Sequence, residues 1–322
     1  MTEFTSGTIR SLRFLVLGSL NMDYILQADH EPDDDGSVWL SASAERPGGH
    51  AGNCAAALAA LGTQVTVLGA VGRDAGGTAI IDGLVASQVD VKRIRRTGNR
   101  TGRVYIPTFP SRRYMLMDRG ANDDLCPDDL PAAMPRCDAI LVFDPPTDVL
   151  DALASTHFDS AASSHTPLFC WNPGGRYAHP SMRQFAVDRF ELLVLNRNEY
   201  HQMFGADSPC LASIGRDDHE TVVTRGRGGA CLYSRDGTTV EQAVPVDAVD
   251  PTGAGDAFCA AMAVARVVGL QVRDRLRFAN TVGALATRAT GAWASLPSFV
   301  AAANAAQIAV GVNANSDEGV SR

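Results

Sequence analysis

A short run at residues 250–256 combines two carboxylates with small residues at the expected start of a helix. It reads Asp-Pro-Thr-Gly-Ala-Gly-Asp, and an apolar stretch follows it. Consecutive small residues at a helix start let several N–H groups converge on an anion, which the helix dipole also favours. A carboxylate suits such a site if it takes a proton from a hydroxyl while the N–H groups stabilise a phosphoryl group in transfer. Asp256 is therefore a candidate general base, with simple helix capping as the alternative.

The same run limits how a phosphate can be bound. Thr252 is a good helix N-cap, and Gly253 and Gly255 permit tight or left-handed backbone. Lys92 is the only lysine, so a phosphate site must use arginine, backbone N–H groups or a metal ion. The sequence contains no P-loop pattern Gly-x-x-x-x-Gly-Lys-Ser/Thr. These features predict a phosphate site built from backbone groups.

A second set of polar residues follows the first apolar run. Asn21 and Asp23 end the predicted first strand, where ligands of open α/β sheets usually bind. An amide and a carboxylate can each hold neighbouring sugar hydroxyls. Gly49 and Asn53 lie at the start of the next predicted helix, so we expect them to approach the same ligand.

Composition narrows the class of partner. The 322 residues carry a formal charge of −8, which argues against nucleic-acid binding. The first apolar run is too short to span a membrane, and no signal-peptide cleavage pattern follows it. The seven cysteines are an odd number and include no Cys-x-x-Cys pair, so neither a disulfide framework nor a zinc site is expected. A reducing cytoplasm fits this pattern best.

Alternating apolar and helical segments predict the elements that position these residues. Four buried strands are expected from Ala139 onward, namely AILVFD, PLFCWN, LLVLN and TVVTRG. A hairpin turning at Asp236-Gly237 follows them, and helices begin at about Ala254 and Val272. This order is typical of βα units. It predicts one α/β domain over residues 1–322, with a doubly wound, mainly parallel sheet flanked by helices.

Half-polar strands interrupt the first half of the chain. Residues 38–46, 103–109 and 113–118 alternate apolar and polar side chains or are half-polar, which suits an antiparallel sheet with one wet face. We expect a small β-sheet lid made from segments at about 24–45 and 97–118. The polar tail at 312–322 is predicted to fray.

Several short motifs occur in the order found in the ribokinase-like (PfkB) family of sugar and nucleoside kinases. The run DPTGAGDAF resembles its C-terminal signature, and the chain is closest in motif to ribokinases. Each further motif is weak alone, but the ordered set is specific; it spans residues from about 14 to 299 and comprises GSLNMD, GGHAGN, VGRDAGG, GAN, NRNE, TRGRGGA and GAWASLP.

The resemblance implies ATP-dependent phosphorylation of a primary hydroxyl, with a role for each matching position. Asp256 would be the general base, and Gly253, Ala254 and Gly255 would form the anion hole. Asn196 and Glu199 would hold Mg²⁺ through water, although helix-start residues are the alternative reading of this pair. The residues implied on the ATP side are Asn196, Thr224, Gly226, Gly229 and Asn280. A monovalent cation such as K⁺ would lie beside Asp250, Thr252 and Ser295.

The acceptor side departs from the ribokinase pattern. The resemblance implies an acceptor site of Asn21, Asp23, Gly49, His50, Asn53 and Asp144. His50 replaces the usual lysine, and Asp144 stands where ribokinases carry a longer glutamate. Ribose or a related sugar is favoured, a nucleoside acceptor is the alternative, and a non-catalytic binding relative is a third reading. Family members also form dimers through the lid, so a homodimer is open here.

Overall fold

The computed structural model describes residues 6–131, 135–155, 166–205 and 217–309. The predicted frayed tail at 312–322 lies outside these ranges. A nine-stranded sheet runs through the centre in the order β13-β12-β11-β10-β9-β8-β1-β4-β5. Neighbouring strands from β11 to β5 are parallel, whereas β12 pairs antiparallel with β11 and forms the predicted hairpin with β13. The large sheet comprises β1 Arg13–Leu17, β4 Gln64–Gly72, β5 Asp90–Thr97, β8 Ala139–Val142, β9 Leu168–Trp171, β10 Leu192–Asn196, β11 Glu220–Thr224, β12 Ala230–Ser234 and β13 Gly237–Glu241.

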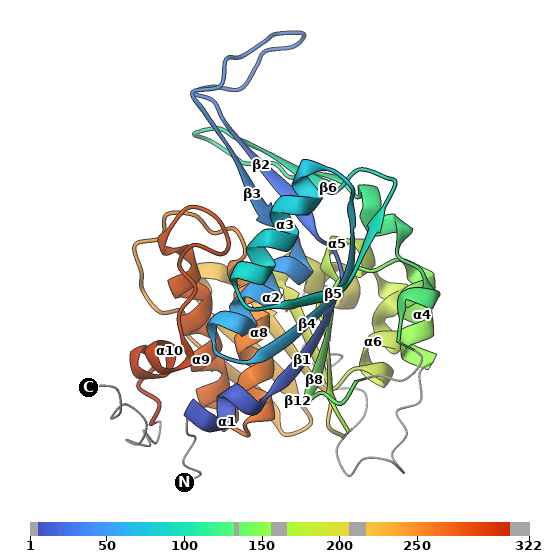
Figure 1. Ribbon diagram of the computed structural model, residues 1–322. Helices are drawn as coiled ribbons and strands as arrows, with labels where there is room; N and C mark the ends of the chain where they lie inside the picture. The colour runs from blue at the N-terminus through green and yellow to red at the C-terminus, as the bar shows by residue number, and fades with distance from the viewer. Residues whose placement is uncertain (1–5, 132–134, 156–165, 206–216, 310–322) are drawn as a thin grey trace, which may run out of the picture.

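Helices cover both faces of this sheet because its strands are apolar on both sides. Along β1, Phe14 and Val16 pack into one core, and Leu15 and Leu17 into the other. The first core contains side chains of α1 Ser6–Ser11, α2 His50–Ala60, α3 Ala75–Ala86, α8 Ala254–Val267, α9 Val272–Leu285 and α10 Phe299–Ala305. The second contains side chains of α4 Thr147–Ser155, α5 Gly174–Tyr177, α6 Arg183–Arg189 and α7 Arg197–Phe204 (Figure 1).

Five short 3₁₀ helices complete the regular structure of the described residues. They span Gly120–Asp124, Pro127–Asp129, Pro180–Met182, Gly226–Gly228 and Ala286–Arg288. This doubly wound arrangement confirms the predicted fold class.

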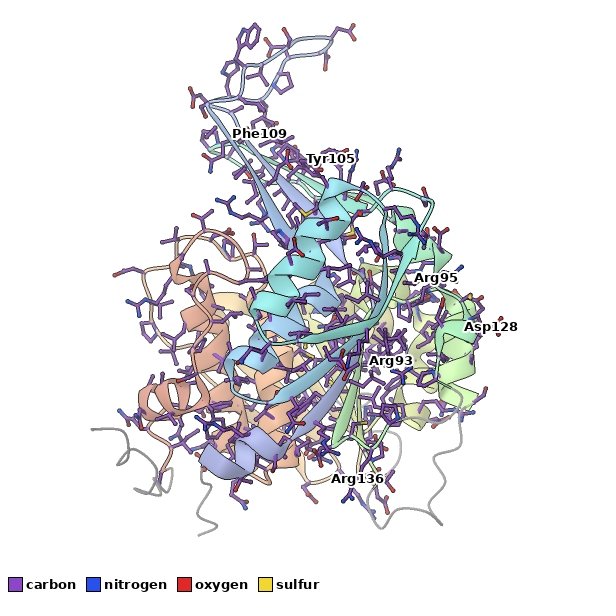
Figure 2. All side chains as sticks on the ribbon, in the orientation of Figure 1. Arg93, Arg95, Tyr105, Phe109, Asp128 and Arg136 are labelled. Carbon is purple, nitrogen blue, oxygen red and sulfur yellow. The ribbon has the colours of Figure 1, made fainter. Side chains whose placement is uncertain are left out.

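A second, four-stranded sheet stands above one end of the large sheet (Figure 1). Its order is β3-β2-β6-β7, with β2 parallel to β6 and the outer pairs antiparallel. Tyr105 and Phe109, from β6 and the turn after it, lie well above the body of the molecule (Figure 2). The strands of this small sheet are β2 Asn21–Gln27, β3 Ala42–Gly48, β6 Gly102–Thr108 and β7 Leu116–Asp118.

The boundary between the two sheets differs from the sequence-based expectation. The first core strand ends at Leu17, so Asn21 and Asp23 begin the small sheet instead of ending that strand. Side chains break the strand: the Ser19 N–H donates to Asp144, and the Leu20 N–H donates to Asn122. The strand β5 and the helix α10 were not predicted.

Two composition-based expectations can be compared with the structure. Cys170, Cys231 and Cys259 are buried core residues, as their apolar surroundings in the sequence indicate. Among the described residues, no helix is both long and apolar enough to cross a bilayer.

Candidate functional site

The turn before α8 leaves its backbone open toward the site. Gly253 is the N-cap residue, with φ of 75°, and no side chain caps the helix. A Cβ at Gly253 would also collide with Ala292, so glycine is required there. Thr252 is therefore not the cap; its hydroxyl donates to Asp250 instead. N–H groups in the first turn of a helix have no partner within it, so this end of α8 can receive an anion.

Asp256, in that first turn, is buried and held at both carboxylate oxygens. His50 Nδ1 lies 2.9 Å from Oδ1, and Asn53 Nδ2 donates to Oδ2 at 2.8 Å. His50 and Asn53 both come from the first turn of α2, which packs against α8. The two helix starts thus bring residues 203 and 206 positions apart into one cluster.

His50 carries a positive charge in this cluster. Burial disfavours its charged form, but the adjacent Asp256 carboxylate outweighs burial and raises the pKa of His50 to about 10. Its ring also lies parallel to that of Phe143, with ring centres 6.1 Å apart. The side chain remains about one-third exposed.

Asp23 faces the same cluster from the small sheet. Burial raises the pKa of Asp23 to about 7, and the charge of Asp256 adds to the rise. The carboxylate occupies the space that a side chain at Gly48 would fill. Gly49 has φ of 85°, and a Cβ there would come within 2.5 Å of the Ser19 carbonyl oxygen. The two glycines therefore let the α2 start approach the small sheet.

Asn21 joins the site through a buried asparagine. Asn122 donates to Asn21 Oδ1 at 2.8 Å, and Asn122 Oδ1 accepts from the Leu20 N–H. Asn122 is the asparagine of the GAN motif. Its bonds to Leu20 and Asn21 fix the chain where it passes from the large sheet to the small one.

Asp144 is occupied by neighbouring groups. One oxygen accepts from the Ser19 N–H at 3.2 Å, and the other accepts from Arg119 at 3.1 Å. The charge of Asp144 also acts on His50. Asp144 can therefore meet a ligand only together with its arginine.

Asp250 organises the turn from the opposite side. Its carboxylate accepts from the Thr252 N–H, the Thr252 hydroxyl and the Gly291 N–H. Burial opposes ionisation, but these bonds hold the pKa of Asp250 below its usual value. The Ser295 hydroxyl donates to the Ala286 carbonyl oxygen and not to a residue of this turn.

Arg113 reaches the same turn from the connection between β6 and β7. Its Nη1 lies 3.4 Å from Thr252 Oγ1 and 3.8 Å from Asp250 Oδ1. Sequence reasoning missed Arg113, because nothing in a half-polar strand indicates which arginine faces the body of the molecule.

Asn196 and Glu199 form a capping box at the start of α7. Asn196 Oδ1 accepts from the Glu199 N–H, and Glu199 Oε2 accepts from the Asn196 N–H. Burial raises the pKa of Glu199, whose other electrostatic neighbours include His50 and Asp256. The pair therefore stabilises a helix start, and one Glu199 oxygen takes no part in the capping box. No cluster of three metal-ligating side chains occurs among the described residues.

The residues expected on the ATP side lie around the end of β11. Thr224 ends that strand, and Gly226 and Gly229 both have positive φ in the turn after it. Asn280 donates to the carbonyl oxygens of Glu241 and Gln242. These bonds anchor the segment after β13, which is a structural task that the sequence did not indicate.

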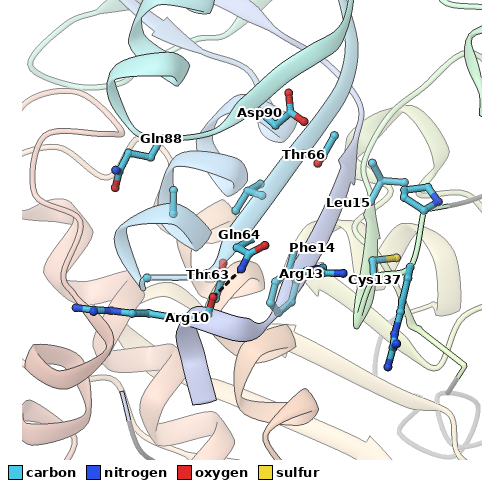
Figure 3. A pocket seen from close by; sticks show the side chains of 15 residues that line it. Arg10, Arg13, Phe14, Leu15, Thr63, Gln64, Thr66, Gln88, Asp90 and Cys137 are labelled. Carbon is cyan, nitrogen blue, oxygen red and sulfur yellow. Dashed lines mark hydrogen bonds between the residues drawn. The ribbon is translucent and has the colours of Figure 1, made fainter. Parts of the chain in front are cut away.

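A separate cavity of about 790 Å³ opens at the opposite end of the large sheet. Figure 3 shows it beside the first residues of β1, β4 and β5, which are Arg13, Gln64 and Asp90. The Asp256 cluster lies instead beyond the carboxyl ends of the strands. The two sites are therefore distinct.

The chain is similar to a known class of kinase over most of its length. Residues 12–298 match the model of the pfkB family carbohydrate kinases, and the chain belongs to that family. It is 29% identical over 287 residues to a Bacillus subtilis ribokinase, covering 88% of this chain and 95% of that protein. It is also 29% identical over 292 residues to an ATP-dependent ribose-1-phosphate kinase of Halopiger xanaduensis, covering 87% and 94% of the two chains.

A solved structure supports the fold. The nucleoside kinase of Methanocaldococcus jannaschii, an archaeal member of the ribokinase family, superimposes with a TM-score of 0.79 at 18% identity. The match covers 92% of this chain and 98% of that one. The predicted family and enzyme class are thus confirmed.

Proposed function

We propose that the chain transfers the terminal phosphoryl group of ATP to a primary hydroxyl of a small sugar, with ribose or a related sugar favoured. The carrying observation is the position of Asp256, in the open first turn of α8 and in contact with the acceptor-side residues His50 and Asn53. Family membership and two relatives that act on ribose or ribose 1-phosphate support the same reaction.

In the proposed mechanism, Asp256 removes the proton of the acceptor hydroxyl. A loose phosphoryl transition state needs this removal only late, so an ordinary carboxylate suffices. The N–H groups of Gly253, Ala254, Gly255 and Asp256 stabilise the transferring group as preorganised donors. Closure of the small sheet as a lid, formed by the segments at about 24–45 and 97–118, would exclude water, so that the acceptor competes with hydrolysis.

The acceptor would bind between the small sheet and the α2 start. Asn21, Asp23 and Gly49 supply hydroxyl partners on one side, and protonated His50 donates from the other. The Asp144–Arg119 pair adds a cation that a lone glutamate would lack. A nucleoside acceptor is the alternative within the family. A non-catalytic binding role is less favoured, because a mere binder has no need of Asp256.

The phosphate and metal partners follow the same assignment. Asn196 and Glu199 would hold Mg²⁺ through water, and Mg²⁺ would neutralise phosphate charge. Thr224, Gly226 and Gly229 would border the ATP phosphates, with Asn280 on the adenine side. Asp250, Thr252 and Ser295 would lie beside a K⁺ ion.

Two wider proposals concern the setting of the enzyme. Six thiols are free among the described residues, which fits a reducing cytoplasm. The small sheet exposes apolar side chains at Leu116 and Met117, which fits a homodimer through that sheet.

The decisive experiment is a coupled ADP-release assay with ribose, fructose, adenosine, inosine and cytidine. At least one acceptor should be turned over, and Asp256→Asn should lower kcat on the order of 100- to 1,000-fold. Asp274→Asn is the matched control, because Asp274 is also an aspartate in the first turn of a helix. Equal rates for the wild type and Asp256→Asn would refute the base assignment, and an equal loss in Asp274→Asn would reduce it to helix capping.

A further inference from the structure

The indole of Trp293 is hydrogen-bonded into the Asp256 cluster. Its Nε1 donates to Asn53 Oδ1 at 2.9 Å. The ring packs over two glycines, Gly52 of α2 and Gly83 of α3. A Cβ added at Gly83 would come within 2.8 Å of the ring, whereas one at Gly52 would touch it at 3.4 Å. A partly buried ring with such close neighbours on two helices holds its N–H in one direction.

This contact decides how the Asn53 amide is oriented. An indole N–H can only donate, so Asn53 must turn its oxygen toward Trp293. The Asn53 amide nitrogen then faces Asp256 Oδ2, at 2.8 Å. Asn53 is also buried, with 6% of its surface exposed, so water does not compete strongly for either end.

We propose that Trp293 is a positioning residue that acts on Asp256 through Asn53. The inference rests on the proposed role of Asp256 as the base. Trp293 fixes the donor face of Asn53, Asn53 holds Oδ2, and His50 holds Oδ1. The carboxylate is thereby held in one rotamer, with its remaining lone pairs available to the acceptor hydroxyl.

Loss of the indole N–H has a specific consequence. The freed amide can rotate by half a turn when Asp256 is protonated, because its oxygen can then accept a hydrogen bond from the carboxyl group. With the indole in place this rotation is blocked, so the substitution stabilises the protonated form and the carboxylate binds a proton more readily. The acidic limb of the rate profile should then move to higher pH, which a simple packing defect does not produce.

The test removes the N–H and keeps the ring. Replacing Trp293 by β-(3-benzothienyl)alanine preserves the two-ring shape, and Trp293→Phe is the encodable counterpart. Both should lower kcat about tenfold, leave KM for ATP within about twofold, and shift the acidic limb upward. Val85→Ala is the control, because Val85 lies on the same helix as Gly83 but is 54% exposed, and it should leave all three values unchanged.

A double-mutant cycle with Asn53→Ala tests the route. If Trp293 acts through Asn53, Trp293→Phe should change kcat less than twofold in the Asn53→Ala background. Additive losses, or a wild-type kcat in the benzothienyl variant, would overturn the inference. Activity lost in Trp293→Phe but kept in the benzothienyl variant would assign the indole to packing alone. A fully active Asp256→Asn would instead overturn the base assignment, so the two failures are distinguishable.

Discussion

Two neighbouring carboxylates of the site respond to burial in opposite ways. Asp250 accepts three hydrogen bonds, which keep it ionised despite its partial burial. Within the described residues the Asp23 carboxylate accepts no hydrogen bond, and it faces the charges of Asp256 and Asp250. Burial without donors therefore makes ionised Asp23 costly to the folded state. A role of Asp23 in ligand binding would explain why the protein keeps a carboxylate that lowers its stability.

Asp23→Asn should therefore stabilise the protein at alkaline pH. The pKa of Asp23 is about 7 when folded and 3.8 as a free side chain, so its ionisation costs stability fully above pH 7. The cost shrinks as pH falls from 7 and vanishes below about 4, where both states are protonated. At pH 8 the substitution should raise the free energy of unfolding by up to ~4 kcal/mol, which corresponds to the difference between the two pKa values.

Urea unfolding at pH 8, 6 and 4.5 measures this dependence, with Asp34→Asn on an exposed loop as the control. The same variant should lose acceptor turnover. A gain that is absent at pH 8, or equal at all three pH values, would contradict the assignment.

Residue types and spacing pointed to Asp256, His50 and Asn53, but they did not show which residues are partners. Asn53 was expected to bind sugar, and the structure pairs it with Asp256 and Trp293. Trp293 lies 240 positions from Asn53 in sequence. It belongs to the motif GAWASLP, in which the sequence assigned no role to the tryptophan. Contacts over such separations depend on how helices pack, which one sequence does not reveal.

At the scale of elements, buried strands were predicted well because apolar runs of four to nine residues mark them. The strand β5 was missed, since its sequence DVKRIRRT is charged on the wet side of an edge strand. The first apolar run was taken as one strand, although side-chain bonds at Ser19 and Leu20 divide it. Local pattern therefore identified core elements better than the edges and the junction that carry the site.

The junction supports a prediction on the connection between β6 and β7. Among the described residues, Arg113 hydrogen-bonds to the Thr252 turn. Because this connection belongs to the small sheet, the positive charge of Arg113 lies at the turn only when that sheet is in place. Arg113→Gln should lower kcat by about 10- to 100-fold, since a cation near a transferring phosphoryl group stabilises its charge. Steady-state kinetics with ATP and the best acceptor measure the effect.

Arg112→Gln is the neighbouring control, because Arg112 pairs with Glu31 and has a 60% exposed side chain. It should keep wild-type kcat. If the two variants behave alike, Arg113 contributes only to the small sheet and not to the turn.

At the scale of the whole molecule, the order of motifs was enough to predict a doubly wound sheet with a smaller sheet attached. The oligomeric state could not be predicted in the same way, because the sequence of one chain does not show which partner covers an exposed face. The structure adds that β7 is a three-residue edge strand whose Leu116 and Met117 side chains are exposed, and that the exposed Tyr114 and Met115 directly precede it. Edge strands of this kind favour pairing with another chain.

A homodimer through the small sheet can be tested by charging that edge. The double substitution Leu116→Lys and Met117→Lys should convert a dimer into a monomer. Lysines from the two copies would repel each other across the interface, and the apolar area that a stable interface buries, about 800 Å² per partner, would be reduced. Mass from light scattering across a concentration series measures the change. Val240→Lys is the control, since Val240 is also exposed on an edge strand, β13 of the large sheet. A monomeric wild type would contradict the dimer. A dimer that survives the double substitution but not Val240→Lys would place the interface at β13 instead.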